Sequence, residues 1–263
     1  MTAARVRAWL LRAWVALVMG FLMLPVVVIA LASLSRTSYL TVPPRGLTLR
    51  WFAQVLGDPE YVHAVGFSVL LALVATAGSL GAGVAASFAL IRRRIPGAAV
   101  ISALLNAPLV FPAVVVGVAL LQFYAMVRLN GTFVGLALAH MVITLPYVVR
   151  AVTASLQGID PELEHAARVL GASGPIAFFT VTLPLIRPGV AAGALFAFIV
   201  SFDNVPVSIF LLGSGQMTLP VKIFSAIEYG VDPSIAAIST LLIVVTGLGL
   251  AVAERWIGFH RFV

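Results

Sequence analysis

The chain has 263 residues, of which 62% are hydrophobic and 10% charged, and its mean hydropathy is +1.12. Because soluble domains carry about 25% charged residues, this composition excludes an ordinary soluble core and indicates membrane insertion. The lack of cysteine excludes a disulfide framework and a thiolate metal site, and the net charge of +7 is scattered between apolar stretches instead of forming a stripe that would bind nucleic acid.

Six apolar stretches approach the length of about 20 residues that a helix needs to cross a bilayer. They predict an all-α membrane protein whose residues 1–263 form a single transmembrane domain. The expected spans are 13–34, 63–90, 98–127, 133–152, 188–212 and 234–254. The first span follows a basic N-terminus, but its apolar run exceeds the about 7–15 residues of a signal peptide, so we expect it to be retained. The third contains Pro108 and Pro112, which predict a kink or a tilt.

Lysine and arginine favour one orientation of these spans, because they accumulate in cytoplasmic loops. With the N-terminus inside, the cytoplasmic basic residues would be Arg5, Arg7, Arg12, Arg92, Arg93, Arg94, Arg150, Arg168, Arg187, Arg255 and Arg261. The external ones would be Arg36, Arg45, Arg50, Arg128 and Lys222. The larger inner set predicts that both termini, and the segment 153–187 between the fourth and fifth spans, lie in the cytoplasm.

This cytoplasmic segment carries the signals of a short helix. Asp160 suits the N-cap and Pro161 the first helical position. Glu162 lies in the first turn and Arg168 in the last, as the helix dipole favours. Gly171 can adopt the left-handed conformation that ends a helix. We therefore expect a helix over 161–170.

One face of this helix is narrow and rich in alanine, with Leu163, Ala166, Ala167 and Leu170 at helical spacing. An isolated helix of this length is marginal in water, so it must pack on something. It could be a connecting loop that packs on its own protein, or a docking helix for a soluble partner. The second interpretation is favoured by the next stretch, ASGPIAFFTVTLP, which predicts another short helix ending at Pro184.

The segment resembles the motif E-A-A-x3-G-x9-I-x-L-P of permease subunits of bacterial ABC importers. In this chain the motif consists of His165, Ala166, Ala167, Gly171, Val181, Leu183 and Pro184, with complete spacing. His165 stands where the family usually has Glu, although Glu164 is adjacent, and Val181 replaces Ile. The resemblance implies a type I importer fold with six transmembrane helices. It also implies a cytoplasmic coupling helix, with Glu164, His165, Ala166, Ala167, Gly171, Leu183 and Pro184 fitting a groove on an ATPase.

Two further stretches, 201–211 and 219–242, are similar to spermidine/putrescine-type importer permeases. The resemblance therefore implies a polyamine cargo, with iron, a phosphonate or another small solute as alternatives. It implies a bacterial inner membrane location and three kinds of partner: a second homologous permease, two ATPase subunits and an external solute-binding protein. Because this chain has no G-x-x-x-x-G-K-[ST] sequence, we expect it not to be an enzyme and ATP and Mg to be held by the partner ATPase.

Asp203 is an acid within the fifth span, about 23 Å along a helix from Pro188 and so beyond the midplane. A central charge costs at least about 2.5–3.5 kcal/mol, so this carboxylate should not face lipid. It could line the substrate path and meet a cation, pair across the interface between permeases, or lie at the outer water boundary. Asn204 adds hydrogen-bonding groups, and Phe202 could contact a cationic substrate through its ring.

The remaining polar residues indicate no chemistry. His63 and His140 lack partners at metal-ligand spacing, so we expect ordinary polar contacts and no metal site. The charges of 213–233 could line an external path or belong to a solvated loop. A stand-alone secondary transporter that uses Asp203 for a coupling ion is the rival function, but inverted repeats are not evident.

Overall fold

The computed structural model describes residues 3–93, 95–230 and 232–257 of the chain. These residues are mainly helical, and among them no strand occurs beyond one isolated antiparallel bridge between Ser35 and Leu47. The expected all-α class is therefore confirmed. The chain divides into two compact units, one of Met1–Val62 with Ile223–Val263 and the other of His63–Lys222. The single domain over 1–263 stays a prediction.

The first unit joins the two ends of the chain. It contains α1 (Ala3–Ser33), α2 (Arg50–Gly57), most of α12 (Leu219–Tyr229) and α13 (Pro233–Ile257). Within it, α13 packs against both α1 and α2. The link between α1 and α2 is held by the buried Trp51, whose indole N–H donates to the carbonyl of Ser35 over 2.8 Å. Most large apolar side chains of α1 are exposed, which suits a surface that meets lipid or another subunit.

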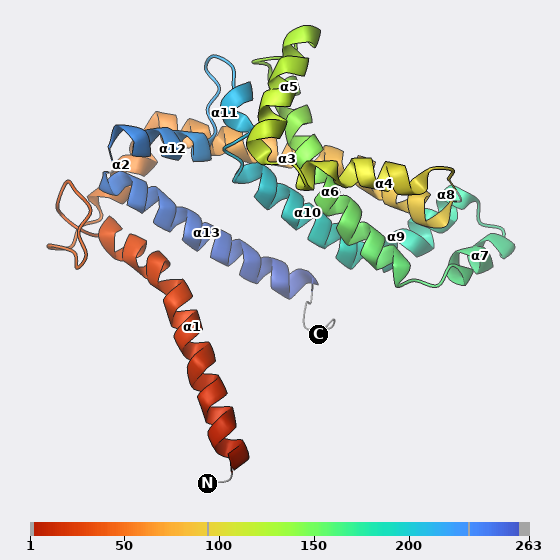
Figure 1. Ribbon diagram of the computed structural model, residues 1–263, viewed down its shortest axis with the longest axis horizontal. Coiled ribbons are helices and arrows are strands. Elements are labelled where there is room, and N and C mark those ends of the chain that lie inside the picture. The colour runs from red at the N-terminus through yellow and green to blue at the C-terminus, as the bar shows by residue number, and fades with distance from the viewer. Residues whose placement is uncertain (1–2, 94, 231, 258–263) are drawn as a thin grey trace. The chain divides into compact units, whose positions relative to one another are not determined.

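The second unit holds the longest continuous part of the fold. Its helices outside the connection between α6 and α10 are α3 (Pro59–Arg92), α4 (Ala98–Asn106), the 3-10 turn η1 (Ala107–Leu109), α5 (Ala113–Val127), α6 (Phe133–Gln157), α10 (Arg187–Phe202) and α11 (Ser208–Leu211). Four short elements connect α6 to α10: α7 (Glu162–Val169), α8 (Gly174–Ala177), the π-helical η2 (Phe178–Thr182) and α9 (Leu183–Leu185). Figure 1 shows this connection beyond one end of α6 and α10.

The pairing of α6 with α10 is the most extensive between any two helices. Glycine makes it close. A Cβ at Gly193 would lie 3.1 Å from the Cα of Val148, and one at Gly189 would lie 2.8 Å from the carbonyl oxygen of Ala151. Small residues at a helix interface let the two backbones approach, which is how membrane helices gain contact without a hydrophobic driving force.

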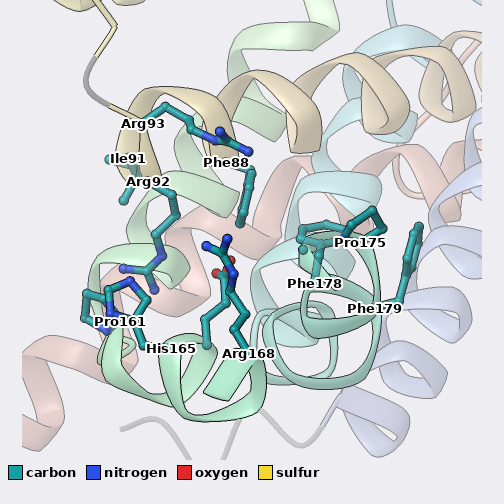
Figure 2. Close-up of a pocket in the computed structure, with 12 residues that line it drawn as sticks. Phe88, Ile91, Arg92, Arg93, Pro161, His165, Arg168, Pro175, Phe178 and Phe179 are labelled. Carbon is teal, nitrogen blue, oxygen red and sulfur yellow. The ribbon is translucent and has the colours of Figure 1, made fainter. Parts of the chain in front are cut away.

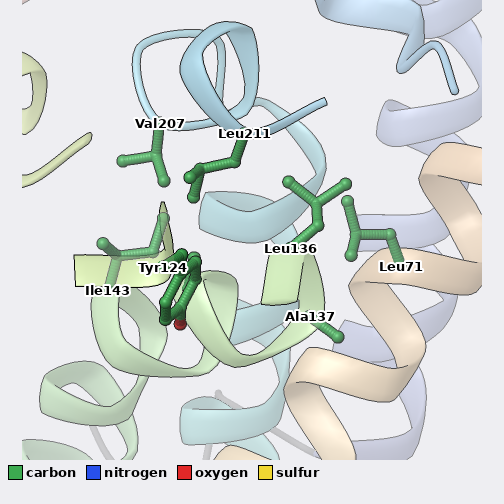
Figure 3. Close-up of a cluster of buried hydrophobic side chains, with 8 residues drawn as sticks. Leu71, Tyr124, Leu136, Ala137, Ile143, Val207 and Leu211 are labelled. Atoms are coloured by element: carbon green, nitrogen blue, oxygen red, sulfur yellow. The ribbon is translucent and has the colours of Figure 1, made fainter. Parts of the chain in front are cut away.

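Buried hydroxyl groups add polar contacts between α3 and α6. Ser79 and Thr144 share a hydrogen bond of 2.7 Å, and Ser87 donates to the carbonyl of Val149 over 3.2 Å. An apolar cluster completes the packing near the start of α6 (Figure 3). Its buried members are Leu71, Tyr124, Leu136, Ala137, Ala139, Ile143, Val207 and Leu211. The cluster draws α3, α5, α6 and α11 together.

Three helical segments of the described chain are long and apolar enough to cross a membrane: Arg7–Ser33, Pro59–Arg92 and Phe133–Gln157. Two bent pairs bring the number to five if each counts as one span, and Pro233–Gly249 is a shorter apolar helix. The first, second and fourth expected spans thus coincide with continuous helices.

The third expected span, 98–127, contains the predicted kink, as a bend of 105° between Ala98–Leu109 and Ala113–Val127. Pro112 lies in extended conformation before α5, where its ring cannot continue a helix. The fifth expected span, 188–212, is not one continuous helix. Its α10 ends at Phe202, and α11 begins only at Ser208. Pro206 explains the gap, because proline lacks an N–H and disfavours helical conformation in the preceding residue.

The close packing of α6 on α10 makes one prediction about stability. Gly189→Ala should lower the free energy of unfolding by about 1–3 kcal/mol, because the new methyl group would come within 2.8 Å of the carbonyl oxygen of Ala151. Thermal unfolding of the detergent-purified chain measures the effect. The control is Gly66→Ala on α3, whose Cβ would meet nothing within 4 Å. Equal stability of the two variants would show that α6 and α10 can separate without cost.

Candidate functional site

The helix expected over 161–170 is present as α7, shorter by one residue at each end. Asp160 accepts the backbone N–H of Glu162 over 3.0 Å, so its carboxylate satisfies one of the free donors at the start of α7. At the other end, Gly171 has φ +96°, a left-handed conformation that favours glycine. The N–H of Ala172 then donates to the carbonyl of Ala167 over 3.1 Å, which closes the helix.

Two polar contacts tie α7 and its entry to the rest of the second unit. Arg92, at the end of α3, donates to the carbonyls of Ile159 over 3.0 Å and Leu156 over 3.5 Å. Glu164 accepts a hydrogen bond of 3.2 Å from the buried hydroxyl of Thr182 in η2. The first turn of α7 and the residues before it are therefore held by their own chain, and α7 is left uncovered.

The alanine-rich face of α7 is open. Leu163 is 49% exposed and Leu170 is 88% exposed. Ala166 is exposed and Ala167 half-buried. No residue of α7 is buried within the described part of the chain. Of the two interpretations of this helix, the geometry favours a docking surface over a loop that packs its apolar face on its own protein.

His165 occupies the position where the resembled motif has Glu, and its side chain is 62% exposed. Its Nδ1 lies 3.6 Å from a carboxylate oxygen of Glu162, one turn earlier. The pair is an ion pair only when the imidazole is protonated, and its exposure makes its contribution to stability small. The motif's usual carboxylate is therefore missing at position 165, and the carboxylate beside it, that of Glu164, is the one held by a buried partner, Thr182.

The aromatic stretch after Gly171 is helical, as predicted. Its predicted end at Pro184 is wrong by one residue, because helical conformation continues to Leu185. The chain passes through a π-helical turn in which the N–H of Leu183 donates to the carbonyl of Phe178, five residues earlier. Proline at 184 provides a physical reason, because it supplies no N–H and would clash with the preceding turn of an α-helix. Leu183 packs against the buried cluster of Val148, Val152, Leu156, Ile186 and Ala197.

A cavity of about 650 Å³ lies between the end of α3, α7 and the α8–η2 turn (Figure 2). Its lining comprises Phe88, Ile91, Arg92, Arg93, Pro161, Glu164, His165, Arg168, Gly174, Pro175, Phe178 and Phe179. Phe88 and Phe178 meet edge to face, with ring centroids 5.0 Å apart. Two of the expected coupling residues, Glu164 and His165, thus also border a hollow that basic side chains line.

The second group of expected site residues lies at the far end of α10, 16 residues from its start at Arg187 and so about 24 Å away along the helix. Asp203 is the C-cap residue of α10. Its carboxylate is exposed and has no hydrogen bond or ion pair with the part of the chain that the structure describes. Asn204 accepts the backbone N–H of Val207 over 2.9 Å and so shapes the gap before α11. Phe202 stacks on Phe198, at 6.0 Å between centroids.

A buried histidine holds the two sides of this gap together. His140 of α6 is completely buried, and its two ring nitrogens contact the hydroxyl groups of Ser201 at 2.8 Å and Ser208 at 3.0 Å. Ser201 lies in the last turn of α10 and Ser208 begins α11. Ordinary polar contacts were expected of His140, but its partners were not, because they lie more than 60 positions away along the chain.

The family described as "Binding-protein-dependent transport system inner membrane component" matches residues 77–260. The putrescine transport system permease protein PotI of Escherichia coli (strain K12) is 33% identical over 243 residues, covering 89% of this chain and 86% of PotI. The spermidine/putrescine transport system permease protein PotC of Haemophilus influenzae is 31% identical over 251 residues, covering 95% of this chain and 97% of PotC.

Among solved structures, the fold is similar to that of a chain of a bacterial ABC transporter involved in the import of the acidic polysaccharide alginate. The TM-score is 0.78 at 16% sequence identity, and the similarity covers 97% of this chain and 98% of the other. At that identity the likeness concerns the fold alone.

The His140 contacts predict a difference between two histidines. His140→Ala should lower the free energy of unfolding by about 1–3 kcal/mol, since it leaves the hydroxyls of Ser201 and Ser208 without their buried partner. His63→Ala removes only an aromatic contact of 6.4 Å with Phe67 and should cost no more than about 0.5 kcal/mol. Thermal unfolding of both variants checks this, and similar losses would show that the buried contacts do not hold the gap.

Proposed function

Since the chain belongs to the family of binding-protein-dependent transport system inner membrane components, and is a permease subunit of an ABC importer, we propose that α7 is the helix through which an ATPase drives it. The observation that carries this proposal is the open face of α7. Its apolar residues are exposed, while its N-terminal part is fixed by Glu164 and by Arg92. A helix that is held in place and left uncovered can transmit force from a partner.

The proposed assembly has the permease as its membrane part. A second, homologous permease would complete the translocation path, and two ATPase subunits would bind and hydrolyse ATP with Mg. An external solute-binding protein would deliver the cargo, in keeping with the description of the family. The distribution of arginine supports placing α7 and both termini on the cytoplasmic side.

A polyamine is the proposed cargo. PotI is a putrescine transport permease, and PotC is a spermidine/putrescine transport permease. In this chain, the exposed carboxylate of Asp203 offers a charge for a cationic solute, and Asn204 and Phe202 lie beside it. A permease of the same family that carries iron, a phosphonate or another small ion is the alternative. A secondary transporter is a weaker one, because it leaves the open face of α7 without a role.

The lack of cysteine makes the docking of α7 directly testable. Ala166→Cys, in cells that are transporting, should cross-link to the ATPase, because its position lies on the open face of α7. Leu40→Cys is the control, since Leu40 is also exposed but belongs to the link between α1 and α2. Denaturing gels should show a cross-linked product of higher mass for Ala166→Cys and none for Leu40→Cys. If Ala166→Cys reacts only within its own chain, the coupling role is refuted.

The role of Asp203 is tested by removing its charge. Asp203→Asn should lower polyamine uptake at least about tenfold in a strain without the native permease, at unchanged membrane levels, because about 1.4 kcal/mol of attraction corresponds to tenfold. Asp203→Glu should keep most of the activity. Asp58→Asn is the matched control, as its side-chain oxygen caps the N–H of Glu60 and an amide can do the same. Normal uptake by Asp203→Asn would remove this residue from the path.

A further inference from the structure

Two adjoining hollows in the second unit have opposite character. The first is the cavity of about 650 Å³ beside α7, called here the basic cavity. The second, of about 490 Å³, is called the apolar groove and is lined by Leu80, Gly81, Val84, Ala85, Phe88, Phe178, Phe179 and Leu183. The two share Phe88, Phe178 and Phe179, so they adjoin at these three aromatic rings. Figure 2 shows Phe88 and Phe178 bordering the hollow that the arginines enter.

Positive charge exceeds negative charge in the basic cavity. Arg92, Arg93 and Arg168 line it together with a single carboxylate, that of Glu164, which already accepts a hydrogen bond from Thr182. This excess of guanidinium groups suits an anion that can accept hydrogen bonds from several of them at once. Phosphate oxygens do this well.

The apolar groove extends from the basic cavity along α3. Positions 80, 81, 84, 85 and 88 lie on one face of that helix and cover about 12 Å of its length. Because α3 is a candidate membrane span that ends at Arg92, the groove runs from the end of the span into its apolar part. A ligand that fills both hollows must therefore carry an anionic group at one end and a hydrocarbon chain at the other.

We propose that this composite site binds an anionic phospholipid, with its phosphate in the basic cavity and one acyl chain in the apolar groove. An acidic segment of a protein partner would match the arginines but would leave the groove unfilled, so the lipid accounts for more of the structure. The bound lipid would connect Arg168 of α7 with Arg92, the last residue of α3, and with the adjoining Arg93. The proposal does not depend on the coupling role of α7, since it requires only that α3 spans the membrane.

Native mass spectrometry of the detergent-purified full chain, titrated with phosphatidylglycerol and with phosphatidylcholine, tests the site. We expect phosphatidylglycerol to bind at least about fivefold more tightly, and Arg93→Gln with Arg168→Gln to weaken it about 25-fold, at about fivefold for each arginine. Arg150→Gln is the charge control, because Arg150 contacts Asn106 outside the cavity. Equal affinity for the two lipids, or an equal loss with Arg150→Gln, would overturn the proposal.

The apolar groove is tested separately with Gly81→Leu. A Cβ at Gly81 would meet nothing within 4 Å, and Gly81 lines the groove, so a larger side chain at this position would occupy space that the acyl chain needs. It should weaken phosphatidylglycerol binding at least about fivefold, whereas Gly66→Leu, equally unobstructed on α3, should not. Competition by glycerol 3-phosphate at the affinity of the lipid would indicate a site for free phosphate instead. Competition by an oligoglutamate peptide that Gly81→Leu does not affect would indicate an acidic protein partner.

Discussion

The close approach of α6 and α10 is the constraint on which both candidate sites depend. Gly189 and Gly193 let the two backbones pack closely, and a methyl group at 189 would come within 2.8 Å of the carbonyl oxygen of Ala151. The connection between these helices is the segment that contains α7, and the opposite end of α10 leads into Asp203. His140, on α6, then contacts both sides of the gap after α10. The pair of helices thus joins the proposed docking surface at one end to an exposed acid at the other.

In an importer, this arrangement would let α6 and α10 transmit a displacement of α7 through the membrane part of the protein. A displacement of α7 would be carried by Glu164 to Thr182 and by the chain itself into α10. Because α10 packs against α6 along its length, it would move with α6 more readily than bend. The gap after Phe202 interrupts the helix, and its side chains include Asp203, the acid of the path proposed for the solute.

Local signals in the sequence were enough for α7 and not enough for the region around Asp203. Asp160 and Gly171 act on neighbouring backbone groups, so the bounds of α7 could be predicted to within one residue. Pro206 is a local signal for an interrupted helix, but the closure of the gap by His140 depends on contacts between distant positions. The basic cavity was missed for the same reason: its arginines come from two elements that only the fold brings together. Their sequence positions indicated topology alone.

The π-helical turn over Phe178–Thr182 restricts how this surface segment can evolve. Such a turn accommodates one residue more than an α-helical turn, and each residue of an α-helix adds a rotation of about 100°. Deleting a single residue there would turn Thr182 away from Glu164 and swing Leu183 out of its buried cluster. Substitutions on the open face of α7 leave these contacts intact. The segment should therefore vary in amino-acid sequence among descendants of this chain while keeping its length.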